Sequence, residues 1–562
     1  MKRIYFLVIS LGFIFTLNSQ SLIKQGAKWS YQDNGQEQGT AWRQTNFDDS
    51  QWKSGEATLG YGSISGTSIK TKVNYGGNKD NKYITTYFRR NFTFNGDNSE
   101  PLALEFKTLI DDGAVIYLNG EELYRININF GDVTFSTIAS ASGNEYEYQR
   151  AIVWANNLKQ GNNVIAVEVH QSFAKSSDMG FDLELNILPS NEVEAVNNIH
   201  FGSKNNPLDK LTITWHSNGQ KDKIKWGYTS DFEKGTFNGA IHNEYFKNLF
   251  DYTFPSLNES SIIYYSIYNS TLNRWTPTKK YKTSVNIKST KFSFTVLGDS
   301  RTRYSDWHKI SKAIPKTDFS IFSGDVVSVG SSAIDWDNWF LSGESYIENN
   351  MIYHCLGNHD VIGGGLYRYK DILVLPQNKY NNETFYSFEY GNAIFICLDS
   401  EIAEDSTQYE WLLETLETYK DKTWKVVWYH SPFYTSPKHV GEMDDYFDTW
   451  WKAFDDYGID VIFNGHTHNY QRTKPINRNV NPTGAVAEYG SEKNQGRCQI
   501  VSGSAGAPQY DVATGWFIEK SESIRHYCLV EIDGNSMKIV AKDENQNVID
   551  SVSFEKKTKP NK

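Results

Sequence analysis

The chain has 562 residues, too many for a single hydrophobic core, so its length predicts about two to four domains. Its formal net charge of -11 gives no basic footprint, which excludes nucleic acid from the expected partners. An aromatic content of 15% with frequent Gly, Asn and Thr indicates β-rich domains of the kind found outside cells.

The first 20 residues have the pattern of a cleavable secretory signal peptide. Lys2 and Arg3 precede an apolar run over residues 4–17, and small or polar residues occupy positions 18–20. The run is short for a membrane span, and no later stretch of the sequence is long and apolar enough to cross a bilayer. We therefore expect residues 1–20 to be removed and the mature protein to be secreted or periplasmic.

Residues 22–190 alternate between short apolar runs and turns, which predicts a β-sandwich. The dipeptide Asn119-Gly120 between AVIYL and EELYR predicts a tight hairpin. The stretches FDDSQW, LGYG and DDGAVIYLNGEE resemble the galactose-binding-like jelly-roll domains appended to many secreted glycoside hydrolases. This resemblance implies a carbohydrate contact through exposed aromatic side chains. The alternative is that these side chains form the core, as they more often do in sandwiches.

Residues 191–288 contain a second set of strand patterns, LTITWHS, KIKWGY and IIYYSIYN. Their length and spacing predict a small immunoglobulin-like or fibronectin III-like sandwich. In residues 290–555, by contrast, apolar strands alternate with helical patterns, which predicts an α/β layered domain. One helix is expected over residues 406–419, with an apolar face formed by Trp411, Leu412, Leu416 and Tyr419.

All four cysteines lie within apolar, strand-like runs of this last region. They are Cys355, Cys397, Cys498 and Cys528. Buried free thiols are the default expectation. An oxidising compartment would also allow a disulfide between Cys498 and Cys528, and the sequence alone leaves that pairing open.

Five short blocks of residues 290–555 place metal-seeking side chains where predicted strands end. The blocks are LGDSR (297–301), SGDVV (323–327), LGNHD (356–360), YHSP (429–432) and NGHTHNYQR (464–472). Each follows an apolar run, and open α/β sheets bind ligands at this carboxyl edge of their strands. The donors are carboxylate, amide and imidazole without thiolate. Such a set suits a pair of Fe, Mn or Zn ions and predicts metal-assisted hydrolysis.

In this order, the blocks resemble the calcineurin-like metallophosphoesterase superfamily and, more narrowly, the purple acid phosphatases. The resemblance covers residues 191–555 and implies two cations bridged by Asp325. The other implied ligands are Asp299 and His468 for the first metal, and Asn358, His430 and His466 for the second. The expected fold class is thus multidomain: a jelly-roll sandwich, a fibronectin III-like sandwich and an α/β layered metallophosphoesterase domain.

The resemblance also implies roles for residues beside the metals. His359 would protonate the leaving alkoxide or hydrogen-bond a phosphate oxygen. Asp360 would orient His359 rather than bind a metal. The segment HSPFYTSPKHVGE resembles the family's substrate-contact segment, which makes His439 a candidate phosphate contact.

Two positions depart from the family pattern, and both concern the first metal. Many metallophosphoesterases begin with D-x-H, whereas this chain has Arg301 at the third position. Purple acid phosphatases supply a Tyr where this chain has Ser328. Arg301 could hold two phosphate oxygens or pair with a nearby carboxylate, and both alternatives are open. Without that Tyr there is no phenolate ligand for Fe(III), so the sequence predicts that the protein is not purple.

The expected function is therefore that of a secreted phosphatase in which a metal-bound hydroxide attacks a small phosphomonoester, with a sugar phosphate as one option. A phosphodiesterase or nucleotide phosphohydrolase using the same site is the alternative within the enzyme class, because the blocks do not set the substrate. The alternative from another class is a non-catalytic carbohydrate-binding or scaffold protein with a degraded first metal site. Metal content separates the two classes.

Overall fold

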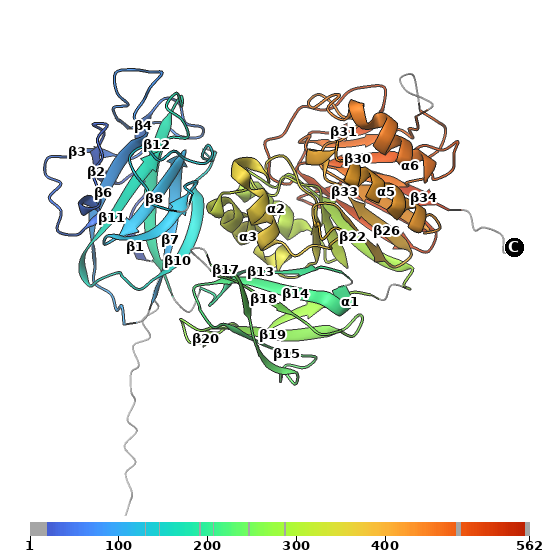
Figure 1. Ribbon diagram of the computed structural model, residues 1–562, viewed down its shortest axis with the longest axis horizontal. Coiled ribbons are helices and arrows are strands. Elements are labelled where there is room, and N and C mark those ends of the chain that lie inside the picture. Colours follow the sequence, from blue (N-terminus) through green and yellow to red (C-terminus); the bar gives the residue numbers. More distant parts are fainter. Residues whose placement is uncertain are drawn as a thin grey trace, which may run out of the picture.

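The computed structural model describes residues 20–556, except positions 100, 130, 145, 190–192, 206, 245–247, 286–287 and 479–484. Nearly all of the predicted signal peptide lies in residues 1–19, outside the described residues. The described chain forms three parts, two built from strands and one from strands and helices (Figure 1). None of the helices among the described residues has the length and hydrophobicity needed to cross a bilayer.

The N-terminal part consists of two sheets that face each other. One has the order β10-β7-β12-β4-β5 with β1 beside β12, and the other has the order β3-β2-β6-β11-β8-β9. Phe88 and Phe181, one from each sheet, stack with ring centroids 4.1 Å apart in the shared core. The strands are β1 (Gln20–Ile23), β2 (Lys28–Gln32), β3 (Lys53–Glu56), β4 (Leu59–Tyr61), β5 (Thr71–Lys72), β6 (Thr85–Phe94), β7 (Leu102–Asp111), β8 (Gly113–Leu118), β9 (Glu121–Ile126), β10 (Gln149–Ala155), β11 (Gly161–His170) and β12 (Met179–Leu188).

The predicted hairpin is confirmed, because Asn119 and Gly120 join β8 to β9 with φ values of 52° and 94°. Positive φ at both central residues is the conformation that Asn-Gly adopts readily in tight hairpins. Trp29 and Trp42 are fully buried. These two indoles therefore belong to the core and cannot offer a face to a sugar.

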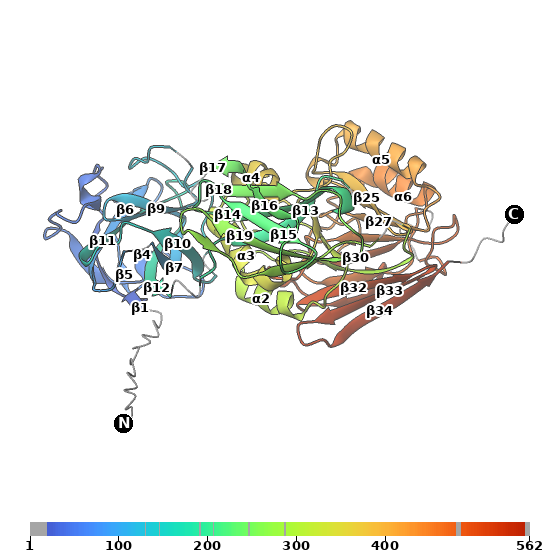
Figure 2. The ribbon, with the colours of Figure 1, turned by 90° about the horizontal axis from the view of Figure 1, so that it is seen from below.

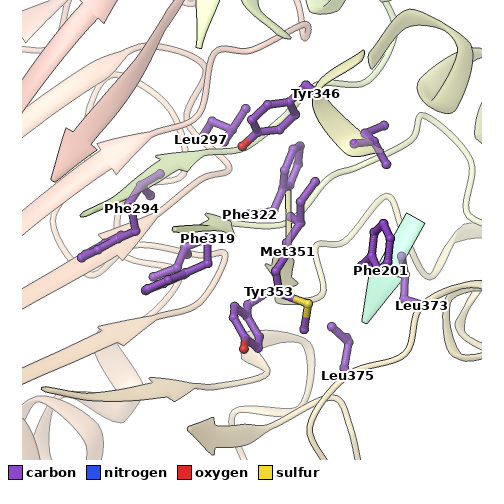
Figure 3. Packing of buried hydrophobic residues seen from close by; sticks show 14 of the residues in the cluster. Phe201, Phe294, Leu297, Phe319, Phe322, Tyr346, Met351, Tyr353, Leu373 and Leu375 are labelled. Atoms are coloured by element: carbon purple, nitrogen blue, oxygen red, sulfur yellow. The ribbon is translucent and has the colours of Figure 1, made fainter. Parts of the chain in front are cut away.

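The second part also has two sheets and shares a core with the third. Phe201 bridges to Met351, and the backbone N–H of Ser203 donates to the carbonyl of Val374 at 3.0 Å. Figure 3 shows Phe201 beside Met351, Leu373 and Leu375. Its elements are β13 (Asn197–Ser203), α1 (Pro207–Lys210), β14 (Leu211–Ser217), β15 (Lys223–Gly227), β16 (Gly235–Asn238), β17 (Ala240–Glu244), β18 (Asn248–Thr253), β19 (Ile262–Asn269), β20 (Arg274–Trp275) and β21 (Lys279–Lys282).

The third part contains two sheets packed face to face, with Phe294 and Phe395 in edge contact at 5.2 Å. The first sheet has the order β24-β23-β22-β32-β33-β34 and the second β25-β26-β27-β28-β30-β29-β31. The strands are β22 (Lys291–Leu297), β23 (Phe319–Phe322), β24 (Ile352–His354), β25 (Tyr386–Tyr390), β26 (Ala393–Cys397), β27 (Trp424–Trp428), β28 (Val461–Asn464), β29 (Tyr470–Thr473), β30 (Cys498–Ser502), β31 (Ile518–Glu522), β32 (His526–Asp533), β33 (Ser536–Asp543) and β34 (Val548–Glu555). Strands β22 to β24, and β26 to β28, run parallel, so their carboxyl ends meet at one edge.

Helices cover the outer faces of both sheets. They are α2 (Tyr304–Ala313), α3 (Ala333–Ile347), α4 (Leu366–Ile372), α5 (Ser406–Thr418) and α6 (Lys452–Asp456). Trp307 of α2 lies against Phe322 of β23, whereas α5 and α6 pack on the second sheet. The helix predicted over residues 406–419 is therefore confirmed as α5.

The four cysteines are buried free thiols, so the disulfide that the sequence left open between Cys498 and Cys528 is not formed. Burial raises the pKa of both thiols to about 12, which keeps them neutral. Their surroundings therefore favour a packing role rather than a reactive one.

One buried carboxyl group outside the metal site predicts how stability depends on pH. Burial raises the pKa of Asp399 to about 7 from an ordinary value of 3.8. Above about pH 4 the unfolded chain loses a proton that the folded chain keeps, so this group lowers the free energy of unfolding by about 1.4 kcal/mol per pH unit up to its folded pKa. Wild type should therefore lose stability relative to Asp399→Asn between about pH 5 and pH 7, as measured by urea denaturation. A constant difference across this window would contradict the prediction.

Candidate metal centre

The ends of five parallel strands bring all of the predicted metal ligands together. Asp299, Asp325 and Asn358 follow β22, β23 and β24, whereas His430 follows β27 and the pair His466 and His468 follows β28. Ligand atoms of Asp299, Asp325 and His468 lie within 4.8 Å of one another. The Nε2 atom of His430 lies 3.2 Å from Oδ1 of Asn358 and 3.3 Å from Oδ1 of Asp325. These ligand side chains thus form one cluster at the carboxyl edge.

The backbone is strained where it presents these ligands. Asp299, Asp325 and His466 have φ values of 55°, 53° and 67°, in a region that non-glycine residues seldom adopt. Two glycines permit the close approach of the loops. A Cβ atom on Gly357 would lie 2.4 Å from Oδ1 of Asp325, and one on Gly465 would lie 2.4 Å from Oδ2 of Asp299.

Backbone carbonyls fix the orientation of three site histidines. The contacts are His359 Nδ1 to Ser328 O at 2.7 Å, His430 Nδ1 to Ser323 O at 2.8 Å and His468 Nδ1 to Pro508 O at 2.7 Å. Because a carbonyl oxygen can only accept, Nδ1 carries the hydrogen in each ring. In its neutral form each imidazole therefore has its lone pair on Nε2, as metal-binding histidines commonly do.

His466 has the opposite arrangement because of a carboxylate that the sequence analysis did not single out. Its Nε2 lies 2.9 Å from Oε2 of Glu442, so Nε2–H donates and Nδ1 keeps the lone pair. That Nδ1 faces Nε2 of His430 at 3.1 Å. Glu442 is the last residue of HSPFYTSPKHVGE, but nothing in the spacing showed that it reaches His466.

The arrangement of these lone pairs fits a cation. Two imidazole lone pairs face each other beside an amide oxygen and a carboxylate, and they repel unless a positive charge lies between them. Burial lowers the pKa of His466 to about 3, and the neighbouring His430 and His439 act in the same direction. Although burial alone would lower the pKa of His430, the carboxylates led by Asp325 raise it to about 10. The pair of His430 and His466 therefore favours a state that carries one positive charge.

The first metal position has fewer protein ligands and a cationic neighbour. Asp299, Asp325 and His468 converge there, and Arg301 lies beside them. Its Nε donates to Oδ2 of Asp325 at 3.0 Å, and its Nη2 lies 3.2 Å from Nε2 of His468. Arg301 therefore pairs with a carboxylate, which is one of the two alternatives that the sequence left open. It contacts two of the three side chains expected to bind the first metal.

Asp360 does not have the role expected of it. Its carboxylate accepts hydrogen bonds from the backbone N–H groups of Asp325, Val326 and Gly357 at 2.9 to 3.0 Å. The ring of His359 is instead held by the carbonyl of Ser328. The expectation that Asp360 orients His359 is thus wrong, because the carboxylate is turned toward the loop that carries Asp325.

The aromatic side chain of Tyr510 lines the same cluster. The ring of Tyr510 stacks on His468 with centroids 4.2 Å apart and lies 5.9 Å from the ring of His439. His439 itself lies 3.7 Å from the ring of His466 and contacts Glu442 at 2.8 Å. The structure thus places the candidate phosphate contact His439 beside the ligands. Tyr510 had no signal in the sequence, since it follows no strand-end block.

Ser328 occupies the position at which the sequence resemblance would supply a Tyr. Its Oγ lies 3.1 Å from Oγ1 of Thr302 and provides no aromatic ring. Protein reconstituted with Fe(III) should therefore show no strong visible charge-transfer band, and Ser328→Tyr would be the variant that introduces one. An intense band in the wild type, measured by visible absorption, would contradict this prediction.

The chain is similar to known phosphoesterases. The family described as calcineurin-like phosphoesterase matches residues 292–470. The chain is 27% identical over 300 residues to purple acid phosphatase 21 of Arabidopsis thaliana, covering 47% of this chain and 67% of that protein. It is 26% identical over 166 residues to Fe(3+)-Zn(2+) purple acid phosphatase 12 of the same plant, covering 25% of this chain and 33% of that protein.

A solved structure shows the same fold over most of the chain. Purple acid phosphatase PPD1 from yellow lupin seeds superposes with a TM-score of 0.58 and 13% identity, covering 84% of this chain and 93% of that chain. The family match and the phosphatase relatives define a hydrolase of phosphoric ester bonds. More particularly, residues 292–470 form a calcineurin-like phosphoesterase domain, and the relatives that the chain resembles are purple acid phosphatases.

Proposed function

We propose that the chain is a secreted or periplasmic phosphatase that hydrolyses small phosphomonoesters with the help of two metal ions. One observation carries the proposal: Nε2 of His430 lies within 3.3 Å of the expected ligand atoms of His466, Asn358 and Asp325. A binding module would have no need for such a cluster. The signal-like pattern of residues 1–20 supports the location.

The ligand chemistry supports Fe, Mn or Zn, because imidazole, carboxylate and amide donors suit these ions. One relative is an Fe(3+)-Zn(2+) purple acid phosphatase, which favours an iron–zinc pair. The first ion would be held by Asp299, Asp325 and His468, and the second by Asp325, Asn358, His430 and His466. Such a pair would supply the positive charge needed to activate water and to polarise phosphoryl oxygens.

The residues around the ions have separate tasks in this proposal. The Nδ1–H of His359 donates to the carbonyl of Ser328. Its Nε2 is therefore available to deliver a proton to the leaving oxygen or to form a hydrogen bond with it. Arg301 has a planar guanidinium at the same edge, suited to two phosphate oxygens once it leaves Asp325. Glu442 holds His466 in its orientation, and His439 is the second candidate for phosphate contact.

The test is hydrolysis of an aryl phosphomonoester and the matching diester by metal-reconstituted protein, with metal content measured on the same samples. Turnover of the monoester with two ions bound is the expected result. Preference for the diester would favour a phosphodiesterase or nucleotide phosphohydrolase at the same site.

A non-catalytic scaffold is the second candidate, and the contacts of Arg301 favour it. The guanidinium donates to Asp325 and lies against His468, which are both first-metal ligands. A chain that uses Arg301 in place of the first ion would bind one metal and show no turnover of either ester.

A further inference from the structure

The N-terminal sandwich is hydrogen-bonded to the loop that carries Asp299 and is linked to the loop that carries Asp325 through one intermediate residue. The contacts come from residues 139–144 and 146–150, named here the interdomain segment, which leads from β9 into β10. We name residues 298–305 the first metal loop, because they carry Asp299, and residues 324–331 the second metal loop, because they carry Asp325. Figures 1 and 2 show β10 next to α3, and the two elements are in contact.

The interdomain segment fixes the first metal loop at two points. The side-chain amide of Asn144 donates to the carbonyl of Thr302 at 2.9 Å in a buried contact. The carboxylate of Glu147 accepts from the backbone N–H groups of Tyr304 and Ser305 and from the hydroxyl of Ser305. Thr302 follows Arg301 directly, so both anchors act on the loop that presents Arg301 and Asp299.

Glu147 also completes a helix that lacks a cap of its own. Helix α2 has no side-chain hydrogen bond at its N-cap, Arg303. Its first N–H groups have no partner within the helix and need an acceptor. The carboxylate from the other domain supplies one, and its negative charge suits the positive end of the helix dipole.

The second metal loop is held through one intermediate residue. The amide of Gln149 donates to Oδ1 of Asp335, and Oδ2 of Asp335 accepts from the backbone N–H of Val329 at 3.0 Å. Val329 follows Ser328, whose carbonyl holds the ring of His359. Gln149 and Asp335 are 4% and 2% exposed, so water does not compete for these hydrogen bonds.

The interdomain segment is itself anchored to its own sandwich. The backbone N–H of Ser140 donates to the carbonyl of Asn127 at 2.8 Å, and that of Ala139 donates to the carbonyl of Gln171 at 2.9 Å. The apolar core of the sandwich continues across the boundary, because Ile334 of α3 is packed within it. A rigid support is therefore available for both metal loops.

We propose that Asn144, Glu147 and Gln149 are positioning residues of the metal centre, so that the N-terminal sandwich is part of the catalytic unit. Residues beyond the ligands that orient a metal site commonly change metal affinity when they are replaced. The inference deepens the proposed function. Its kinetic consequences rest on that function, whereas its expectation for metal binding does not.

The test compares Glu147→Ala, Glu147→Gln and Gln149→Ala in the full chain with Tyr124→Phe. Tyr124 donates to Asp337 of α3 across the same boundary, and this hydrogen bond lies outside both metal loops, so its loss controls for weaker domain contact. Zn²⁺ affinity is measured on chelator-stripped protein, and hydrogen exchange is followed in peptides covering both metal loops.

Glu147→Ala and Gln149→Ala should weaken Zn²⁺ binding about tenfold and speed exchange in the loop that each one holds, because such supporting contacts are typically worth about 10- to 100-fold. Tyr124→Phe should leave both unchanged. If all variants only lower the melting temperature, with Zn²⁺ affinity and loop exchange as in the wild type, the inference is overturned. Should the alanine variants not fold, Glu147→Gln decides by the same two readouts.

The two proposals can fail separately. A wild type without phosphoester turnover would remove the proposed function, yet metal affinity and exchange would still test the positioning role. If turnover is found, Glu147→Ala should raise the inhibition constant of inorganic phosphate together with KM, because Arg301 lies in the loop that Glu147 holds.

Discussion

Asp325→Asn should remove phosphoester hydrolysis and lower metal content in the same protein. Asp325 is 1% exposed, and its two oxygens face different partners: Oδ2 faces Arg301, whereas Oδ1 faces His430. No other predicted ligand reaches both metal positions. Loss of this carboxylate would weaken the binding of both ions, so we expect kcat/KM to fall on the order of 100-fold or more.

The measurement combines kinetics with metal analysis on the same samples. Asp533→Asn is the matched control, because Asp533 forms a surface ion pair with Lys291 and its side chain is 66% exposed. The control should keep wild-type turnover and metal content. Unchanged turnover in Asp325→Asn would reject the assignment of Asp325 as the bridging ligand.

Metal counting on the wild type also decides between the enzyme and the scaffold. Asp299 and His468 remain well placed for an ion, but Arg301 already donates to Asp325 at 3.0 Å. Two bound ions would mean that Arg301 moves away from Asp325 when the first ion binds, which leaves its guanidinium free to bind phosphate. A single ion with no turnover would mean that the guanidinium charge has taken over the first position.

The strand-end positions of the ligands could be predicted from the sequence, because each follows an apolar run that can only be a buried strand. LGDSR after FSFTV and GNHD after MIYHC are examples of this pattern. Helix α5 was predictable for the same reason, since its period of apolar residues is local. A short-range sequence pattern is sufficient to predict the position of a side chain when a single strand or helix determines both its burial and its direction.

Hydrogen-bond partners could not be predicted in this way. Asp360 neighbours His359 in sequence, yet its carboxylate holds the backbone of Asp325 and Gly357. Glu442 and His466 are 24 residues apart, and Glu147 and Tyr304 are 157 apart. Such pairs depend on how loops and domains come together, which no local spacing encodes. The supporting contacts of the site are therefore the part that required the structure.

His359→Ala should lower kcat while leaving metal content unchanged. The ring of His359 is held by the carbonyl of Ser328, and its backbone N–H donates to Asp325, so the side chain is not among the six ligands. Loss of a general acid costs about 10²- to 10⁴-fold in rate. Its matched control is His308→Ala, because His308 is an exposed histidine on α2 whose ring contacts the carbonyl of Ser342.

Two roles remain for His359, general acid and phosphate contact, and substrates with different leaving groups distinguish them. An alkyl phosphate needs a proton on its departing oxygen, whereas a nitrophenyl phosphate releases a stable phenolate without one. If His359 is the general acid, His359→Ala should reduce turnover of the alkyl phosphate far more than that of the nitrophenyl ester. Equal losses for both substrates would instead assign the imidazole to a phosphate oxygen, since that contact is the same whichever group departs. Unchanged kcat for both would exclude His359 from the reaction.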